Sequence, residues 1–252
     1  MKKTIVSIII VAAFVTGLVF LVRINPLVLQ PEVTPSLAPS QSVLITQQPE
    51  MVSVAEDSYL LEITGGYPQF PQADDMFNKK IADAITAETG EFKKYASEDY
   101  QAQLTTDSGD LFQKRFEQGE MYTLSWNTEV IQSNDNYISV IIRQESYTGG
   151  AHGSRVARSF NYDVKQHKEL ILTDLMSYEK ASQVSRESFK KVFTENGDRE
   201  VFESFALEGT DPKIPENFQV FTMTPDVITI YFNEYQVAPY VYGEQQVVIP
   251  IK

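Results

Sequence analysis

Residues 121–164 read MYTLSWNTEVIQSNDNYISVIIRQESYTGGAHGSRVARSFNYDV, and this stretch decides the fold. Apolar and polar residues alternate through most of it, a period typical of strands that bury one face. The alternation is interrupted at Asn134–Asn136 and again at the glycines around His152, where turns are expected. The stretch therefore predicts three consecutive antiparallel strands.

Helical periods flank this meander on both sides. Helices are expected over about 74–95, 111–119 and 178–196, the first capped by Asp74 or Asp75. Further strands are expected over about 52–63, 218–223, 227–232 and 245–251, with a turn at Gly65-Gly66. Because helices and strands cluster without strict alternation, the predicted class is α+β, a largely antiparallel sheet with packed helices.

The amino terminus predicts a single transmembrane helix. Thr4–Val22 is a run of 19 uncharged residues, long enough to cross a bilayer. The run exceeds the apolar part of an ordinary signal peptide and no Ala-x-Ala site follows closely, which favours an anchor in residues 1–23 over a cleaved signal segment. Lys2 and Lys3 precede the run, so the expected location is the cell membrane, single-pass, with the C-terminal domain outside the cytoplasm.

The composition of residues 24–252 indicates a linker followed by a folded part, and it limits the classes of partner that the folded part is expected to bind. Residues 24–50 contain five prolines and two charged residues, which is typical of an extended linker. Two α+β modules packed as one unit are expected after it, over 51–164 and 165–252. Residues 51–252 hold 18 basic and 32 acidic residues, which disfavours nucleic acid and favours a cationic partner.

The sequence offers little catalytic chemistry. It contains no cysteine, no Gly-x-Ser-x-Gly elbow, no P-loop and no His-Glu-x-x-His motif, so those nucleophiles and metal sites are excluded. We expect neither catalysis nor a cofactor. A carboxylate pair acting as a wall glycosidase stays an alternative, because the folded part has many acids and the sequence selects no pair among them.

Two segments are candidate binding surfaces. The first is the glycine-rich turn with Tyr147, Thr148, Gly149, Gly150 and His152. It is interpreted either as a tight turn, in which His152 caps a backbone carbonyl, or as a surface where bare amides approach a ligand. A metal site centred on His152 is the weaker alternative, because His167 is the only other imidazole.

The second segment, 231–243, contains four tyrosines, and about half of them should be core residues. The others should form an aromatic contact surface, for which the candidates are Tyr235, Tyr240 and Tyr242.

Together these segments resemble a known family. The residues that carry the resemblance are Tyr147–Gly153, Phe160–Asp163, Leu172–Leu175 and Tyr231–Tyr240, and the family is the PdaC/RsiV-like extracytoplasmic domain family. In that family the module occurs beside a peptidoglycan deacetylase domain and as the outer half of a membrane-anchored anti-sigma factor that binds lysozyme. The resemblance implies an envelope module that binds a lysozyme-like protein or peptidoglycan.

We expect neither the deacetylase domain nor the cytoplasmic anti-sigma domain of these relatives here, so no catalytic residue is carried over. The expected function is a membrane-tethered extracytoplasmic binding module of the bacterial cell envelope, without catalysis of its own. A wall hydrolase and a structural envelope subunit are the alternatives.

Overall fold

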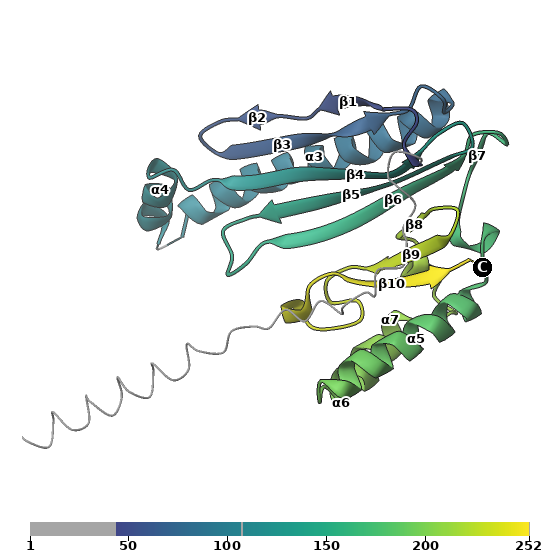
Figure 1. The fold of residues 1–252 in the computed structure, drawn as a ribbon. Coiled ribbons are helices and arrows are strands. Elements are labelled where there is room, and N and C mark those ends of the chain that lie inside the picture. The colour runs from purple at the N-terminus through teal and green to yellow at the C-terminus, as the bar shows by residue number, and fades with distance from the viewer. Residues whose placement is uncertain (1–43, 107, 252) are drawn as a thin grey trace, which may run out of the picture. The chain divides into compact units, whose positions relative to one another are not determined.

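The computed structural model describes residues 44–106 and 108–251 (Figure 1). The expected membrane segment Thr4–Val22 and most of the linker lie outside the described residues. In the part that is described, no helix is long and apolar enough to cross a bilayer. The described residues form two sheets with packed helices, so the α+β class is confirmed.

The first sheet contains the predicted meander. Its strands are β1 (Glu50–Ser53), β2 (Glu56–Asp57), β3 (Leu61–Gln69), β4 (Tyr122–Ser133), β5 (Tyr137–Tyr147), β6 (Ser154–Asp163) and β7 (Lys168–Glu169). The order is β1-β3-β4-β5-β6-β7, with β2 also paired to β3. Strands β4, β5 and β6 pair antiparallel, as their alternation predicted.

One pair in this sheet is parallel. Strands β3 and β4 run side by side from Leu61 opposite Tyr122 to Gly65 opposite Trp126. The crossover between them holds α3 (Asp75–Leu104) and α4 (Gly109–Glu117), the long connection that a parallel pair requires.

The predicted turn at Gly65-Gly66 is wrong, because both glycines lie inside β3. A Cβ atom on Gly65 would lie 2.1 Å from the Trp126 carbonyl oxygen, and one on Gly66 would lie 2.2 Å from the Val52 carbonyl oxygen. Glycine is therefore needed here for close approach of neighbouring strands rather than for a change of direction.

Helix α3 covers one face of the first sheet. Its N-cap, Asp74, accepts a hydrogen bond from the Phe77 N–H at 2.8 Å. A buried stripe follows at helical spacing and packs on the sheet: Phe77, Ile81, Ile85, Thr89, Phe92, Ala96 and Tyr100. Trp126 lies under this helix, 3% exposed, and its indole N–H donates to Thr89 Oγ1 at 3.1 Å.

The second sheet has three antiparallel strands in the order β10-β9-β8. They are β8 (Phe221–Met223), β9 (Val227–Phe232) and β10 (Gln245–Pro250). The helices of this half are α5 (Tyr178–Glu195), α6 (Arg199–Val201) and α7 (Leu207–Gly209), with a π-helical turn over Phe202–Ala206 between the last two. Phe189 and Phe193 of α5 and Phe232 of β9 belong to its separate hydrophobic core.

The two sheets contact each other through the faces that α3 and α5 leave open. Ile141, Ala157 and Tyr231 form a small apolar cluster between them. Asn161 Nδ2 donates to the Phe221 carbonyl at 2.8 Å, and the Met223 N–H donates to Ser139 Oγ at 2.9 Å. The outer edge of β8 therefore forms hydrogen bonds with polar side chains of the first sheet, in the place of a neighbouring strand.

Candidate functional site

The glycine-rich turn after β5 is built by backbone requirements at two of its glycines. Gly149 has φ +85°, the left-handed region that favours glycine. A Cβ atom on Gly153 would lie 2.8 Å from the Ser146 carbonyl oxygen, whereas one on Gly150 would meet nothing closer than 3.8 Å. The turn therefore fits the first interpretation given for it, and it fixes where His152 is presented.

His152 is exposed and stacks on a tyrosine from the second half of the chain. Its Nδ1 lies 2.8 Å from the Gly153 carbonyl oxygen, the carbonyl cap that the tight-turn interpretation expects. Its ring stacks on Tyr240 with centroids 3.8 Å apart and planes at 20°. Tyr235 follows at 5.8 Å from Tyr240. We name these three residues, His152, Tyr240 and Tyr235, the aromatic ledge.

Tyr235 carries the clearest sign of a specialised role. Its backbone has φ +67°, which is uncommon for a bulky residue, and its side chain is 56% exposed. Such backbone strain persists only where surrounding contacts impose it, and it concentrates at functional sites. Val241, on the other side of Tyr240 in the sequence, is 79% exposed. The ledge and the neighbouring Val241 therefore expose apolar side-chain surface to water.

Two side chains next to Tyr235 bind the loop between β9 and β10, which we name the ledge loop (residues 233–244), to the edge of β6. Asn233 Oδ1 accepts from the Ala157 N–H at 2.7 Å, and its Nδ2 lies 3.4 Å from the Ala157 carbonyl oxygen. Glu234 Oε2 accepts from the Arg155 N–H at 3.2 Å. The backbone N–H groups at this edge of β6, which another strand could otherwise pair with, are therefore hydrogen-bonded by side chains instead. Alternation in the sequence gives no sign of these contacts.

The other predicted binding residues lie elsewhere. Tyr242 packs against Phe193, and its hydroxyl donates to Asp198 Oδ2 at 2.6 Å. Burial, with the Asp198 bond, raises the pKa of Tyr242 to about 12. Tyr147 is half-buried at the end of β5, opposite Thr123, and Thr148 is half-buried next to it. The structure thus brings together the glycine-rich turn and two of the three tyrosines.

The ledge offers ring surfaces for stacking and backbone groups for hydrogen bonding. The amides of Gly149 to His152 have no hydrogen-bond partner among the described residues. Within the same residues, no group of three His, Asp or Glu side chains could hold a metal ion. Exposed rings beside free amide donors suit the recognition of a sugar or a protein loop.

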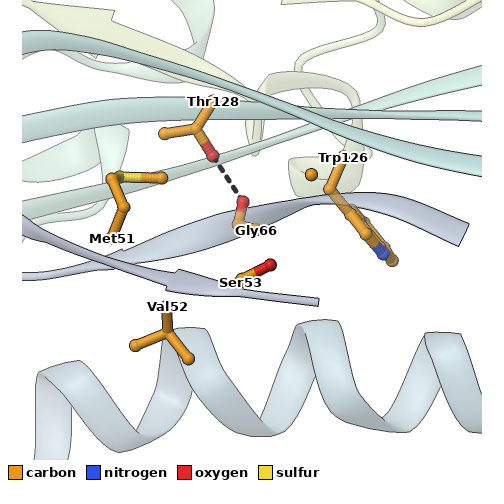
Figure 2. A pocket seen from close by; sticks show the side chains of 7 residues that line it. Met51, Val52, Ser53, Gly66, Trp126 and Thr128 are labelled. Atoms are coloured by element: carbon orange, nitrogen blue, oxygen red, sulfur yellow. Dashed lines mark hydrogen bonds between the residues drawn. The ribbon is translucent and has the colours of Figure 1, made fainter. Parts of the chain in front are cut away.

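A separate hollow lies between β1, β3 and β4 (Figure 2). It measures about 310 Å³ and is lined by Met51, Val52, Ser53, Gly65, Gly66, Trp126 and Thr128. Thr128 Oγ1 donates to the Gly66 carbonyl at 2.9 Å, the bond drawn in Figure 2. None of the lining residues is ionisable, so we assign the hollow to the spacing of the strands around the two glycines.

Comparison with known proteins gives two family matches. Residues 54–155 match the family described as Deacetylase PdaC, and residues 168–252 match the family described as Protein of unknown function (DUF3298). The chain is 26% identical over 205 residues to the peptidoglycan-N-acetylmuramic acid deacetylase PdaC of Bacillus subtilis (strain 168). That alignment covers 79% of this chain but 39% of the relative, so the chain spans about two fifths of that protein's length.

Solved structures share the fold. A DUF3298 family member from Bacteroides fragilis NCTC 9343 superposes with a TM-score of 0.50 at 21% identity. A DUF3298 family protein from Pseudomonas aeruginosa PAO1 gives a TM-score of 0.50 at 16% identity. Each comparison covers 80% of this chain and 89% of the other.

Proposed function

The chain belongs to the PdaC/DUF3298-like domain family, and we propose that it is an extracytoplasmic, non-catalytic module that binds cell-wall material through the aromatic ledge. The family expected from the glycine-rich and tyrosine-rich segments is confirmed. The ledge draws on both family matches, because His152 lies in the first matched range and Tyr235 and Tyr240 lie in the second.

The observation that carries this proposal is the exposed, strained Tyr235 at the end of a ring stack. Water-exposed aromatic rings held in one orientation lose little freedom when a ligand packs on them. The faces of sugar rings are largely C–H groups that pack on aromatic rings, and acetamido groups accept hydrogen bonds from amides such as those of Gly149 to His152. The printed name of the Bacillus relative gives peptidoglycan as its substrate, which supports a wall glycan as the ligand class.

The hydrolase alternative has weaker support. Glu129 and Glu244 both lie close to Arg143, with side-chain contacts of 3.1 and 3.0 Å. A glycosidase needs one carboxylic acid that donates a proton and a second carboxylate across the scissile bond. Because the Arg143 guanidinium binds both of these groups, the arrangement favours a structural role for them.

A cationic protein such as lysozyme is the second candidate ligand, and the charge of the domain favours it. Residues 51–252 carry 32 acidic and 18 basic residues, which attracts basic proteins over long range. Such attraction fades at about 0.15 M salt, where the Debye length is about 8 Å, unless contacts at the ledge add short-range binding.

Calorimetry of the full chain tests the proposal. The purified protein is titrated with soluble peptidoglycan fragments and separately with lysozyme, at low salt and at about 0.15 M salt. We expect saturable binding of the fragments that Tyr235→Ala weakens at least tenfold. The matched control is Tyr95→Ala, which removes an exposed tyrosine from α3, 51% exposed, away from the ledge.

Equal fragment affinity in both variants would exclude the ledge as the glycan site. Binding of lysozyme alone at about 0.15 M salt would replace the glycan with the protein partner. Cleavage of the fragments would support the hydrolase, and self-association in sedimentation with no ligand bound would support a structural subunit.

We also propose that Thr4–Val22 anchors the protein in the cell membrane with the domain outside. Its length and its flanking lysines support this arrangement. Amino-terminal sequencing of protein extracted from its membrane should find the start at or near Met1. A mature start between residues 24 and 50 would contradict the anchor.

A further inference from the structure

Residues 44–47, at the end of the expected linker, dock on the turn between β4 and β5. The N–H groups of Thr46 and Gln47 both donate to the Ser133 carbonyl, at 2.9 and 3.1 Å. Ser133 Oγ donates to the Gln47 carbonyl at 2.5 Å, and Asn134 Nδ2 lies 3.4 Å from the Leu44 carbonyl. Ile45 pairs with Ser133 as an isolated parallel bridge, and Leu44 is buried. The entering chain is thus fixed to this turn.

The aromatic ledge lies at the opposite end of the same strand. Strand β5 has 11 residues and starts at the docked turn. It ends at the glycine-rich turn that presents His152, and an antiparallel strand of this length spans about 34 Å at about 3.4 Å per residue. The docking segment and the ledge are therefore separated by the full length of β5.

The carboxyl end of the domain also points away from the ledge. The ledge loop joins β9 to β10, so β10 runs from the ledge toward Pro250. The Ile251 N–H donates to the Asp226 carbonyl at 2.9 Å, just before β9 begins. Strand β8 links this end to the start of β5, because the Met223 N–H donates to Ser139 Oγ.

We infer that the ledge is the end of the domain farthest from its attachment, so that the ledge engages a wall polymer on the side away from the point where residues 1–43 join. The choice of ligand rests on the proposed function, whereas the direction rests on the hydrogen bonds of residues 44–47 and on the course of β5 from that turn to the ledge. The acidity of the domain also opposes contact with anionic lipid.

Spin-label distances in the full chain test the direction. The protein has no cysteine, so paired cysteines can be introduced without background labels. One label is placed at Ser40→Cys, before the docking segment. In the first pair the second label is at Asn136→Cys, in the turn between β4 and β5. In the second pair it is at Gly150→Cys, in the glycine-rich turn. Asn136 is exposed, and a Cβ on Gly150 has room. We expect the pair with residue 150 to be longer by on the order of 30 Å.

Equal distances in the two pairs, or a shorter one to residue 150, would overturn the inference. Thr46→Pro with Gln47→Pro removes the two N–H donors to Ser133 and should broaden the distance from residue 40 to residue 136. An unchanged distribution in that variant would show that the docking bonds do not direct the chain.

A second measurement separates this inference from the proposed function. The affinity for peptidoglycan fragments is compared for the full chain in detergent micelles and in lipid nanodiscs. Equal affinities are expected, because the ledge lies at the end of β5 opposite the docked residues 44–47. Loss of affinity in nanodiscs would overturn the direction even if the glycan is the correct ligand. Absence of fragment binding in both settings would refute the proposed function, while the label distances would still decide the direction.

Discussion

Arg143 and Glu244, 101 residues apart in the chain, form a forked ion pair between β5 and the loop that leads into β10. Arg143 Nη2 lies 3.0 Å and Nε lies 3.1 Å from Glu244 Oε1. Their side chains are 21% and 14% exposed, and the guanidinium also lies 5.4 Å from the centre of the Tyr231 ring. The pair therefore ties the ledge loop to the first sheet in a partly dehydrated setting.

Loss of this pair should destabilise the domain more than loss of a surface pair. We expect Glu244→Gln to lower the free energy of unfolding by about 2 kcal/mol, because a sheltered guanidinium loses its charged acceptor. The matched control is Glu145→Gln, which breaks the exposed pair with Arg155 and should cost less than about 1 kcal/mol. Urea denaturation of both variants measures the difference, and equal costs would contradict it.

Relief of the strain at Tyr235 should separate stability from binding. Tyr235→Gly accepts φ +67° freely, whereas Tyr235→Ala keeps the strain, so the glycine variant should be more stable than the alanine variant by about 1 kcal/mol. Both variants should lose ligand affinity, since both remove the ring. Thermal unfolding with parallel calorimetry tests this, and an alanine variant as stable as the glycine variant would mean that the backbone is not strained.

Substitution by alanine should change the free energy of unfolding differently at two glycines of the glycine-rich turn after β5. Gly153→Ala places a Cβ atom 2.8 Å from the Ser146 carbonyl oxygen and should lower stability by about 1–2 kcal/mol. Gly150→Ala has open space and should stay within about 0.5 kcal/mol of the parent. Urea midpoints distinguish them. A neutral Gly153→Ala would show that the turn can widen without cost.

The cap of α3 should make stability depend on acid pH. Hydrogen bonds from the Phe77 N–H and from the Tyr162 hydroxyl lower the pKa of Asp74 below its unfolded value. A lowered folded pKa contributes stability above the unfolded pKa of about 3.9, and that contribution is lost as pH falls through the folded value. Asp74→Asn should therefore cost about 1 kcal/mol at pH 7 and less near pH 3.

The neighbouring Asp75→Asn is the control for that measurement. Asp75 is exposed in the first turn of α3 and does not cap it, so its substitution should change stability little at either pH. Urea denaturation at the two pH values gives both differences. An Asp74→Asn cost that stays constant with pH would show that the carboxylate charge does not contribute.

Alternation predicted the meander because the apolar residues in the first part of β4 fall on one buried face. Tyr122, Leu124 and Trp126 are all buried, as their spacing in β4 indicated. The parallel pairing of β3 with β4 could not be predicted in this way, because the partners are separated by the whole of α3 and α4. The predicted turn at Gly65-Gly66 was wrong because glycine is favoured both in turns and where neighbouring strands approach closely, and the sequence alone does not distinguish the two.

The candidate site was predicted in its parts but not in its assembly. Composition identified the glycine-rich turn and the tyrosine-rich segment, yet no local pattern reports that His152 stacks on Tyr240 across 88 residues of sequence. Tyr242 has the same residue type and nearly the same position as Tyr240, but it turns toward Asp198. A short 3₁₀ turn over Tyr240–Tyr242 separates the two rings, and its geometry depends on tertiary contacts.

The placement of the docked segment at one end of β5 and the ledge at the other has a mechanical consequence. A pull on the ligand, resisted at residues 44–47, would act along β4 and β5, across hydrogen bonds that lie perpendicular to the strands. Such a load is shared by the whole ladder at once, whereas a pull at one edge would break the bonds one by one. The strands of the sheet thus lie along the line that joins the docked segment to the ledge, so a load between these two points would be carried along the strands.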